Sequence, residues 1–481
     1  MIPKVIDGRK SDAVLWNSIN WSKAEQIVNR LQMRIVKAEK ANNPQKVRGL
    51  QRLLARSLAA KLLAVKKVTS NRGKRTPGVD NILLDSSGKK WQQAEQLNKS
   101  GYKSQPLKRV YIPKKNGKQR PLGIPTMHDR AEQSLEQQGL DPVSETTADN
   151  HSYGFRKKRS AHDAISACFN ALRLKGSARW ILEADIKGCF DHIDHNWMLN
   201  NIPTRKSKLT QWLKAGYLER SVFNPTNEGT PQGGIISPTL ANVALDGIEA
   251  LLGNTFNRRD KLHFVRYADD FIITGNSREI LEERVQPLVE EFLRKRGLTL
   301  SAEKTRISNI AEGFDFLGFN LRKYAGKLLI KPAKSSIIRL KSNIREVIKM
   351  NKTIKTADLI RQLNPILTGW GNYYRHVVSK AIFCSLDHEI WKMTWQWATR
   401  RHPNKALGWI KSKYYQSVGS RNWVFKEQRD SITLHKLGDI PIRRHLKIKS
   451  QANPYDPAWQ EYFINRLQRV LPGAQPHFTN A

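Results

Sequence analysis

The chain has 481 residues, of which 83 are basic and 42 acidic, and its formal net charge is +41 at pH 7. This length predicts about three domains, and a hydrophobic content of 39% with 13 tryptophans excludes a wholly disordered chain. So large an excess of positive charge suits a polyanionic partner, and nucleic acid is the commonest one.

The three cysteines, Cys168, Cys189 and Cys384, lie far apart and show no zinc-ligand spacing. They predict neither a metal–thiolate site nor a disulfide framework, and they suit small core residues in a reducing compartment. No signal peptide is expected, because the N-terminus carries charges and lacks an apolar run. No uncharged apolar stretch reaches the roughly 18 residues of a membrane span, so we expect a cytoplasmic protein without a membrane partner.

The first third of the chain predicts helices followed by a hairpin. Apolar residues recur at three- and four-residue steps over residues 21–68, which predicts helices with basic outer faces. Residues 109–112 and 121–124 predict two strands joined by an Asn-Gly turn. Residues 131–139 contain a glycine and three glutamines, so we expect a helix there to be marginal or solvent-facing.

The middle of the chain alternates strands with helices. Strands are expected over residues 180–186 and 262–267, and helices over residues 161–174, after Pro238, and over residues 277–296. Such alternation between about residues 105 and 330 predicts an α/β or α+β core.

Beyond Pro332 the sequence becomes helical, basic and rich in tryptophan. Trp391 and Trp395 lie four residues apart, as do Met393 and Trp397, so each pair follows one side of a helix. Core packing is favoured for these pairs over a nucleic-acid platform. Residues 443–449 alternate cations with aliphatic side chains, as in a strand with one phosphate-facing side. A solvated edge strand is the alternative.

The most informative segment is Tyr267-Ala268-Asp269-Asp270, which lies between two apolar runs. Two adjacent carboxylates at the tip of a short β-hairpin repel each other, and Mg²⁺ prefers oxygen ligands of this hard kind. A solvated turn is the alternative, since Asp is common in turns.

Asp185 ends the apolar strand that begins at Trp180, and a carboxylate in that place needs a partner. One interpretation is the N-cap of a following helix. The other joins Asp185 to Asp269 and Asp270 around two metal ions about 3.5–4 Å apart, which would stabilise the attacking and leaving oxygens of phosphoryl transfer.

Both features belong to a longer series of motifs. In chain order these are RVYIPK (109–114), NGKQRPLGIP (116–125), NHSYGFR (150–156), ADIKGCF (184–190), GTPQGGIISP (229–238), FVRYADD (264–270), GLTLSAEK (297–304), FDFLG (314–318), LNPILTGW (363–370) and RRHPN (400–404). With these motifs in this order, the chain resembles the reverse transcriptases encoded by bacterial group II introns, most closely their chloroplast-like branch. The resemblance covers nearly the whole chain.

The resemblance implies an α+β right-hand polymerase. Its expected parts are an N-terminal basic helical extension at residues 1–80, fingers and palm at 81–330, a helical thumb and maturase domain at 331–420, and a small basic DNA-binding region at 421–481. The family often ends in a Cys/His-rich HNH endonuclease, whereas no cysteine follows Cys384. We therefore expect no second-strand cleavage by this chain.

The resemblance also implies roles for individual residues. Asp185, Asp269 and Asp270 would be catalytic and, with Ile186, would hold Mg²⁺. The residues expected at the nucleotide are Lys114, Arg120, Phe190, Gln232 and Lys304. The residues expected at the primer end are Phe316, Leu317 and Gly318, and those expected on target DNA are Arg443, Arg444, Lys447 and Lys449.

Structural alternatives stand beside several of these roles. Lys114 and Arg120 also suit solvated hairpin cations, and Lys304 suits a surface cation. Phe190 also suits core packing, and Gln232 suits a residue of a Gly-rich turn.

The implied reaction is RNA-directed DNA polymerisation from an RNA template, a primer and deoxynucleoside triphosphates. As a maturase the protein would bind group II intron RNA in a bacterial ribonucleoprotein, assist splicing, and support mobility by target-primed reverse transcription. The alternatives are an RNA-binding maturase with little polymerase activity, an RNA-dependent RNA polymerase, and a reverse transcriptase of a defence or CRISPR system.

Overall fold

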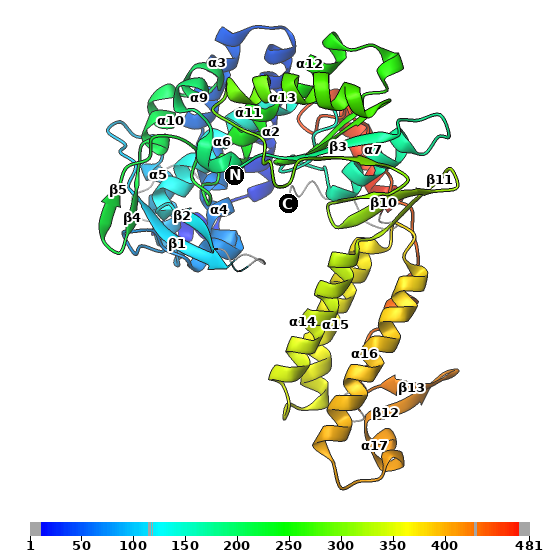
Figure 1. Ribbon diagram of the computed structural model, residues 1–481. Helices are drawn as coiled ribbons and strands as arrows, with labels where there is room; N and C mark the ends of the chain where they lie inside the picture. Colours follow the sequence, from blue (N-terminus) through cyan, green and yellow to red (C-terminus); the bar gives the residue numbers. More distant parts are fainter. Residues whose placement is uncertain (1–10, 114–116, 118, 428–430, 471–481) are drawn as a thin grey trace. The chain divides into compact units, whose positions relative to one another are not determined.

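The computed structural model describes residues 11–113, 117, 119–427 and 431–470. The chain folds into two units, each built from segments that are distant in sequence (Figure 1). Unit 1 comprises residues 1–160, 182–307 and 448–481, and unit 2 comprises residues 161–181 and 308–447. The finer division into four domains stays a prediction.

The N-terminal part of unit 1 is helical, as the apolar periodicity predicted. Its helices are α1 Asp12–Asn17, α2 Trp21–Lys40, α3 Pro44–Arg56, α4 Leu58–Ser70 and α5 Ser87–Gln96. The side chains of Asn20 and Asn43 cap α2 and α3, because each accepts a hydrogen bond from a backbone N–H three residues later. Apolar side chains of α2 and α4, including Ile35 and Leu62, are fully buried in the shared core.

Helix α6, Met127–Thr147, lies in the middle of unit 1, and the prediction of a marginal or solvent-facing helix is wrong. Several of its polar side chains are buried and partnered. Glu132 forms an ion pair with Lys208 of helix α10, Lys206–Leu213, and the Gln138 amide donates to the carbonyl of Ala60 at 2.9 Å. Hydrogen bonds and an ion pair offset the desolvation that would otherwise exclude these residues from a core.

The predicted hairpin between residues 109 and 124 is confirmed. Strands β1 Leu107–Pro113 and β2 Gln119–Ile124 pair antiparallel. They extend through β4 Tyr217–Glu219 to β5 Val222–Asn224, in the order β2-β1-β4-β5. The Arg109 guanidinium lies 3.6 Å from the ring centre of Tyr217, where a cation–π contact supports the β1–β4 junction.

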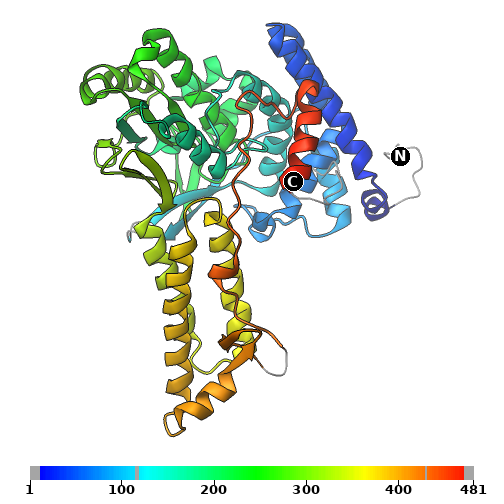
Figure 2. The ribbon, with the colours of Figure 1, turned by 90° about the vertical axis from the view of Figure 1, so that its right-hand side faces the viewer.

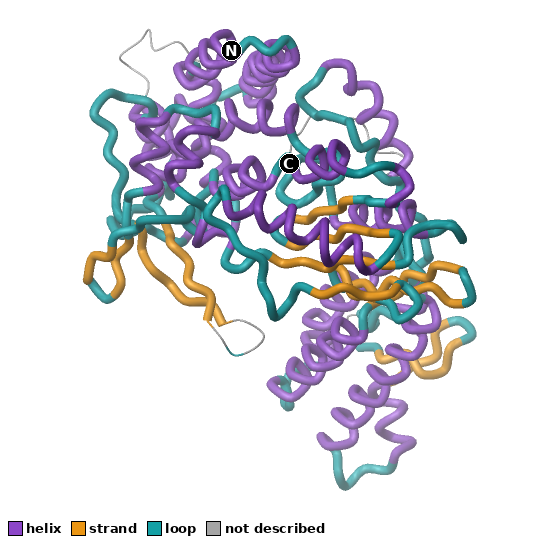
Figure 3. The backbone as a smooth tube through the Cα atoms, turned by 45° about the horizontal axis from the view of Figure 1, so that its top comes forward, coloured by secondary structure: helices purple, strands orange, loops and turns teal. Residues whose placement is uncertain are grey.

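A second four-stranded sheet carries the strands on which the acidic motifs lie. Its order is β6-β7-β3-β8, from β6 Phe264–Tyr267, β7 Asp270–Gly275, β3 Trp180–Asp185 and β8 Arg306–Asn309. The strands predicted at residues 180–186 and 262–267 are therefore confirmed. Helices α11 Ser237–Leu245 and α13 Gln286–Arg294 lie above this sheet in the view of Figure 1, and Figure 3 shows strands in orange among purple helices. A π-helical turn, Ile280–Val285, precedes α13.

The other helices of unit 1 are short or late in the chain. They are α8 Cys189–His192, α9 His195–Asn201, α12 Ile248–Thr255 and α18 Gln460–Val470. None of the helices in the described ranges is long and apolar enough to cross a membrane.

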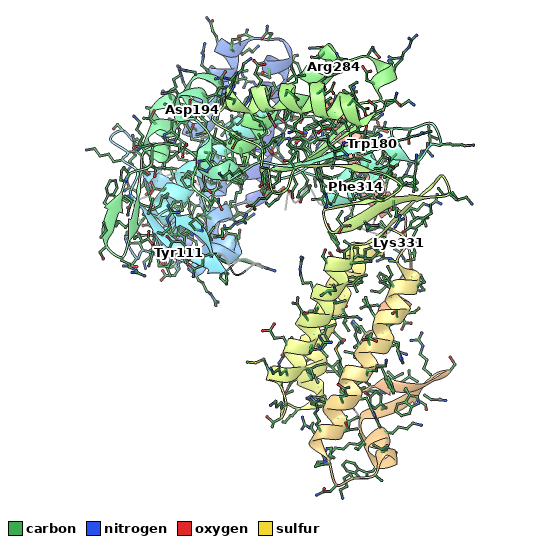
Figure 4. All side chains as sticks on the ribbon, in the orientation of Figure 1. Tyr111, Trp180, Asp194, Arg284, Phe314 and Lys331 are labelled. Carbon is green, nitrogen blue, oxygen red and sulfur yellow. The ribbon has the colours of Figure 1, made fainter. Side chains whose placement is uncertain are left out.

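Unit 2 combines helix α7, Ala161–Leu172, with a small sheet and a helical bundle. The sheet has the order β11-β10-β9, from β9 Phe314–Phe316, β10 Phe319–Tyr324 and β11 Lys327–Pro332. Phe314 and Lys331 mark two of its strands in Figure 4. The long helices α14 Lys334–Met350, α15 Thr356–Tyr374 and α16 Lys380–Arg401 run side by side (Figures 1 and 2), followed by α17 Leu407–Tyr414 and the hairpin of β12 Tyr415–Val418 and β13 Arg421–Phe425.

The tryptophans of α16 pack against protein, as the core interpretation predicted. Trp397 is buried, and its indole N–H donates to the carbonyl of Asn351 at 2.9 Å. Trp391 and Trp395 stack with ring centres 6.4 Å apart, and both pack edge-on against Trp423 of β13. These two rings are only half-buried.

The strand predicted at residues 443–449 is wrong. The segment is extended but belongs to no strand, and within unit 2 the backbone N–H of Arg443 donates to the carbonyl of Arg375 at 3.0 Å. Alternation in sequence gives a strand only where a neighbouring strand completes the ladder of backbone hydrogen bonds. Arg443 and Arg444 are exposed, whereas His445 is half-buried.

Candidate active site at the β6–β7 hairpin

The β6–β7 hairpin presents two carboxylates at its tip. Tyr267 pairs with Asp270, so the turn consists of Ala268 and Asp269. Ala268 has a φ of 58°, the left-handed conformation that tight hairpin turns require at this place. The predicted hairpin with an acidic tip is thus confirmed.

Gly154 packs directly against the backbone of this turn. A Cβ added to Gly154 would lie 2.2 Å from the backbone nitrogen of Ala268 and 2.9 Å from its Cα. The backbone carbonyl of Gly154 also accepts a hydrogen bond of 2.9 Å from the Asn242 side chain. The motif around residue 154 therefore needs glycine because two backbone segments meet there.

A buried cation fixes the strand that leads into the turn. Arg266 is fully buried, and its guanidinium donates to Asp246 at 2.5 Å and to Asn242 at 3.1 Å. Its backbone exchanges hydrogen bonds with His151 and Tyr153, at 3.0 and 2.9 Å. Charge pairing and backbone pairing together anchor the hairpin.

Asp185 ends β3 and is 8% exposed. It is not an N-cap, because the following helix α8 has Gly188 in that position. Ser301 N donates to the Asp185 carbonyl and Lys187 N to the Thr299 carbonyl, at 2.8 and 3.0 Å, on either side of an antiparallel bridge at Ile186. In this antiparallel pattern the carbonyl of Ile186 makes no hydrogen bond to the neighbouring segment. The carbonyl of Ile186 therefore suits its predicted role as a metal ligand.

The three aspartates act on one another electrostatically. Burial raises the pKa of Asp269, and the Asp185 carboxylate raises it further. Partial burial, a hydrogen bond with Asp185, and the charge of Asp269 raise the pKa of Asp270 to about 7. Because residue 270 is exposed to water, like-charge repulsion from Asp269 and Asp185 contributes strongly to this shift. The structure therefore brings the three predicted carboxylates together.

Lys304 is the cation that lies on this cluster. Its Nζ is 2.5 Å from Asp185 Oδ2, although its side chain is 65% exposed. The hydrogen bond to Asp185 raises the pKa of Lys304 above its ordinary value. Its ammonium group offsets part of the negative charge of the three carboxylates.

Hydrogen bonds join the segment that contains Phe190 to the segment that contains Gln232. The Phe190 carbonyl accepts a hydrogen bond of 2.6 Å from Thr230 N, and Gln232 Nε2 lies 3.0 Å from both carboxylate oxygens of Asp191. The half-buried Phe190 ring packs edge-on against Phe155, with centres 6.2 Å apart. Phe190 is therefore no core residue, and Gln232 is held in place.

Two cations, Arg120 and Lys114, were predicted at the nucleotide from the β1–β2 hairpin. Arg120 on β2 is exposed, and its charge lowers the pKa of Asp269, so the two lie within electrostatic reach. Lys114 lies outside the described residues.

The residues predicted at the primer end form a turn in unit 2. Leu317 and Gly318 connect β9 to β10 with φ values of 51° and 81°, and the Tyr373 and Tyr374 hydroxyls donate to their carbonyls at 2.9 and 3.0 Å. Phe316 is buried at the end of β9. Their contact with a primer stays a prediction.

The residues predicted on target DNA are divided between the units. Lys449, in unit 1, is exposed, and its Nζ lies 5.2 Å from the ring centre of Tyr462. Arg443, Arg444 and Lys447 belong to unit 2. DNA binding by the four residues stays a prediction.

Sequence reasoning missed three residues that position the site: Gly154, Asp191 and Arg266. Each belongs to or directly follows a motif, but its role depends on a partner in another segment. Only Gly154 gave a signal, because a glycine within an aromatic motif suggests close backbone approach.

Comparison with known proteins identifies the class of this site. Residues 112–321 match the family described as "Reverse transcriptase (RNA-dependent DNA polymerase)", and residues 16–97 match its N-terminal domain. Residues 337–415 match the "Group II intron, maturase-specific domain". The chain is thus a reverse transcriptase, an RNA-directed DNA polymerase of a class that uses divalent metal ions.

Individual relatives narrow the class. The chain is 32% identical over 303 residues to protein YkfC of Escherichia coli, covering 54% of this chain and 79% of YkfC. It is 32% identical to the group II intron-encoded protein LtrA of Lactococcus lactis, covering 60% of each chain. A putative COX1/OXI3 intron 2 protein of Saccharomyces cerevisiae is 27% identical, covering 54% of this chain and 37% of that one. The chain belongs to the family of group II intron-encoded reverse transcriptases and maturases.

Proposed function

We propose that the chain extends a primer on an RNA template, with Asp185, Asp269 and Asp270 as ligands of Mg²⁺. The observation that carries this proposal is the convergence of the three carboxylates, which raises the pKa of Asp270 to about 7. A protein gains no stability from clustered carboxylates, so such a cluster marks a functional site.

The donor set fits a hard divalent cation. Three carboxylates and the carbonyl of Ile186 offer oxygen ligands alone, the kind that Mg²⁺ prefers. Two ions bound there would lower the pKa of the primer 3′-hydroxyl and stabilise charge on the triphosphate. The ion pair between Lys304 and Asp185 must then open, because both cations would compete for one carboxylate oxygen.

Lys304 takes a second role when that pair opens. Its exposed side chain is free to turn toward the β- and γ-phosphates of a bound triphosphate. From there an ammonium group donates a proton to the pyrophosphate as it leaves. Arg120 supplies a further fixed positive charge to the same phosphates.

Phe190 selects the sugar, and Gln232 positions the nucleotide. Thr230 N fixes the backbone of Phe190 by a hydrogen bond, and the Phe155 ring packs edge-on against the half-buried Phe190 ring. A ring fixed beneath the sugar would clash with a 2′-hydroxyl, so deoxynucleotides are the substrate. Asp191 orients the Gln232 amide toward that site.

The maturase domain defines the RNA partner. We infer that residues 337–415 bind group II intron RNA and assist its splicing. The descriptions of that domain family and of the protein LtrA both name group II introns. The excess of basic residues suits this polyanion. Intron mobility by target-primed reverse transcription, with target DNA as the primer, completes the proposal.

The test neutralises the acidic tip. The Asp269→Asn/Asp270→Asn variant should lose cDNA synthesis on a primed RNA template while binding that RNA with unchanged affinity. The matched control is Glu282→Gln/Glu283→Gln, which removes two adjacent exposed carboxylates from the π-helical turn before α13. Primer extension by the aspartate variant at the rate of the control would refute the assignment.

A further inference from the structure

Three histidines that are distant in sequence meet within unit 2. His162 comes from α7, His376 follows α15, and His445 comes from the extended segment near its end. Their ring centres are 4.6 Å apart for His162 and His376, and 5.5 Å apart for each of the other two pairs. One ring nitrogen of each histidine lies within 4.8 Å of one nitrogen of each of the others.

Each of these rings is held by an oxygen acceptor at one nitrogen. His162 Nε2 lies 2.7 Å from the Tyr373 carbonyl, and His376 Nδ1 lies 2.7 Å from the Arg443 carbonyl. His445 Nε2 lies 2.9 Å from the carboxylate of Asp163, whose side chain is fully buried. Histidines that bind metal ions characteristically donate their other N–H to a carbonyl or carboxylate in this way.

The spacing of the rings fits a tetrahedral metal ion. With metal–nitrogen bonds of about 2.0–2.1 Å, three imidazoles around one zinc ion have ring centres about 5.2 Å apart. The observed separations of 4.6 to 5.5 Å bracket that value. Three histidines also leave a fourth position for water.

Aromatic packing also holds His162, whose ring centre is 4.9 Å from that of Tyr373, but packing alone requires no second or third histidine.

We propose that His162, His376 and His445 bind a zinc ion, with Asp163 as the outer partner of His445. The ion would link α7, the turn after α15 and the segment around residue 445, and water would complete its tetrahedral coordination. Imidazole ligands in a tetrahedral arrangement select zinc over magnesium, which prefers oxygen ligands in an octahedron.

The test uses the full chain in the Asp269→Asn/Asp270→Asn background, so that the acidic cluster does not take up added metal. Metal-free protein is titrated with zinc alone and, in parallel, with cobalt(II). We expect one ion per chain, the visible absorption of tetrahedral cobalt(II), and X-ray absorption showing nitrogen ligands at about 2.0 Å from zinc. No uptake, or a shell of oxygen ligands alone, would overturn the proposal, and neither measurement depends on a histidine variant that folds.

Variants then locate the ion. His376→Gln should abolish stoichiometric uptake, and Asp163→Asn should weaken zinc binding by about 10- to 100-fold. The His388→Gln variant, which changes an exposed histidine of α16, should bind zinc with the stoichiometry and affinity of the unmodified chain. Equal zinc binding by His376→Gln and His388→Gln would show that the ion lies elsewhere and would overturn the proposal.

Discussion

Replacing Gly154 with alanine tests whether backbone packing positions the catalytic carboxylates. The new Cβ would lie 2.2 Å from the backbone nitrogen of Ala268, where ordinary contact requires at least about 3.4 Å. The turn must therefore move by about 1 Å, and Asp269 follows Ala268 directly. A displacement of that size costs roughly 100-fold in rate, because the reacting groups no longer align.

The assay is single-turnover primer extension on an RNA template with saturating deoxynucleotides. Gly154→Ala should slow the chemical step by roughly 100-fold while leaving RNA affinity unchanged. The control is Gly253→Ala on α12, where an added Cβ meets nothing within 4 Å. This control should keep the normal rate and gain up to about 1 kcal/mol of stability. A normal rate for Gly154→Ala would refute the claim that this contact sets the position of the hairpin tip.

Four further outcomes follow from the same contacts. Below pH 7 the carboxyl of Asp270 keeps a proton that a metal ion must displace. The half-saturating Mg²⁺ concentration in primer extension should therefore rise roughly tenfold per pH unit below pH 7. A half-saturating concentration that stays constant between pH 8 and 6 would contradict this. Without metal, the raised pKa means that native stability is lost as pH rises from the unfolded value of 3.8 through about 7, so Asp270→Asn should raise Tm more at pH 8 than at pH 5 in thermal melts. Phe190→Val should raise ribonucleotide relative to deoxynucleotide incorporation by about 10- to 200-fold in competition assays, and an unchanged ratio would show that the ring does not contact the sugar. Lys208→Met should cost about 3–5 kcal/mol in urea unfolding, because it leaves the fully buried Glu132 carboxylate without its cation, and the double variant with Glu132→Gln should recover much of that loss.

The elements with local signals could be predicted from the sequence. The helices over residues 21–68 follow from apolar periodicity, and the β6–β7 hairpin follows from apolar runs around an acidic turn. The association of Asp185 with Asp269 and Asp270 required the order of the motifs, because nothing local to Asp185 names its partners. That association is the part of the site on which sequence and structure agree most closely.

The features that sequence reasoning missed depend on distant partners. Helix α6 buries Glu132 because Lys208, 76 residues away, supplies the opposite charge. The segment around Arg443 alternates like a strand, yet no neighbouring strand pairs with it in the described structure. His162, His376 and His445 show no ligand spacing in the sequence, because only the fold of unit 2 brings them together.

The most direct measurement of the central claim counts metal ions at the hairpin tip. The full chain is bound to an RNA–DNA primer-template and a non-hydrolysable deoxynucleotide, and Mn²⁺ is followed by electron paramagnetic resonance as the probe. The account predicts two spin-coupled ions about 3.5–4 Å apart that disappear in Asp269→Asn. Isolated ions only, or a coupled pair that survives Asp269→Asn, would contradict it.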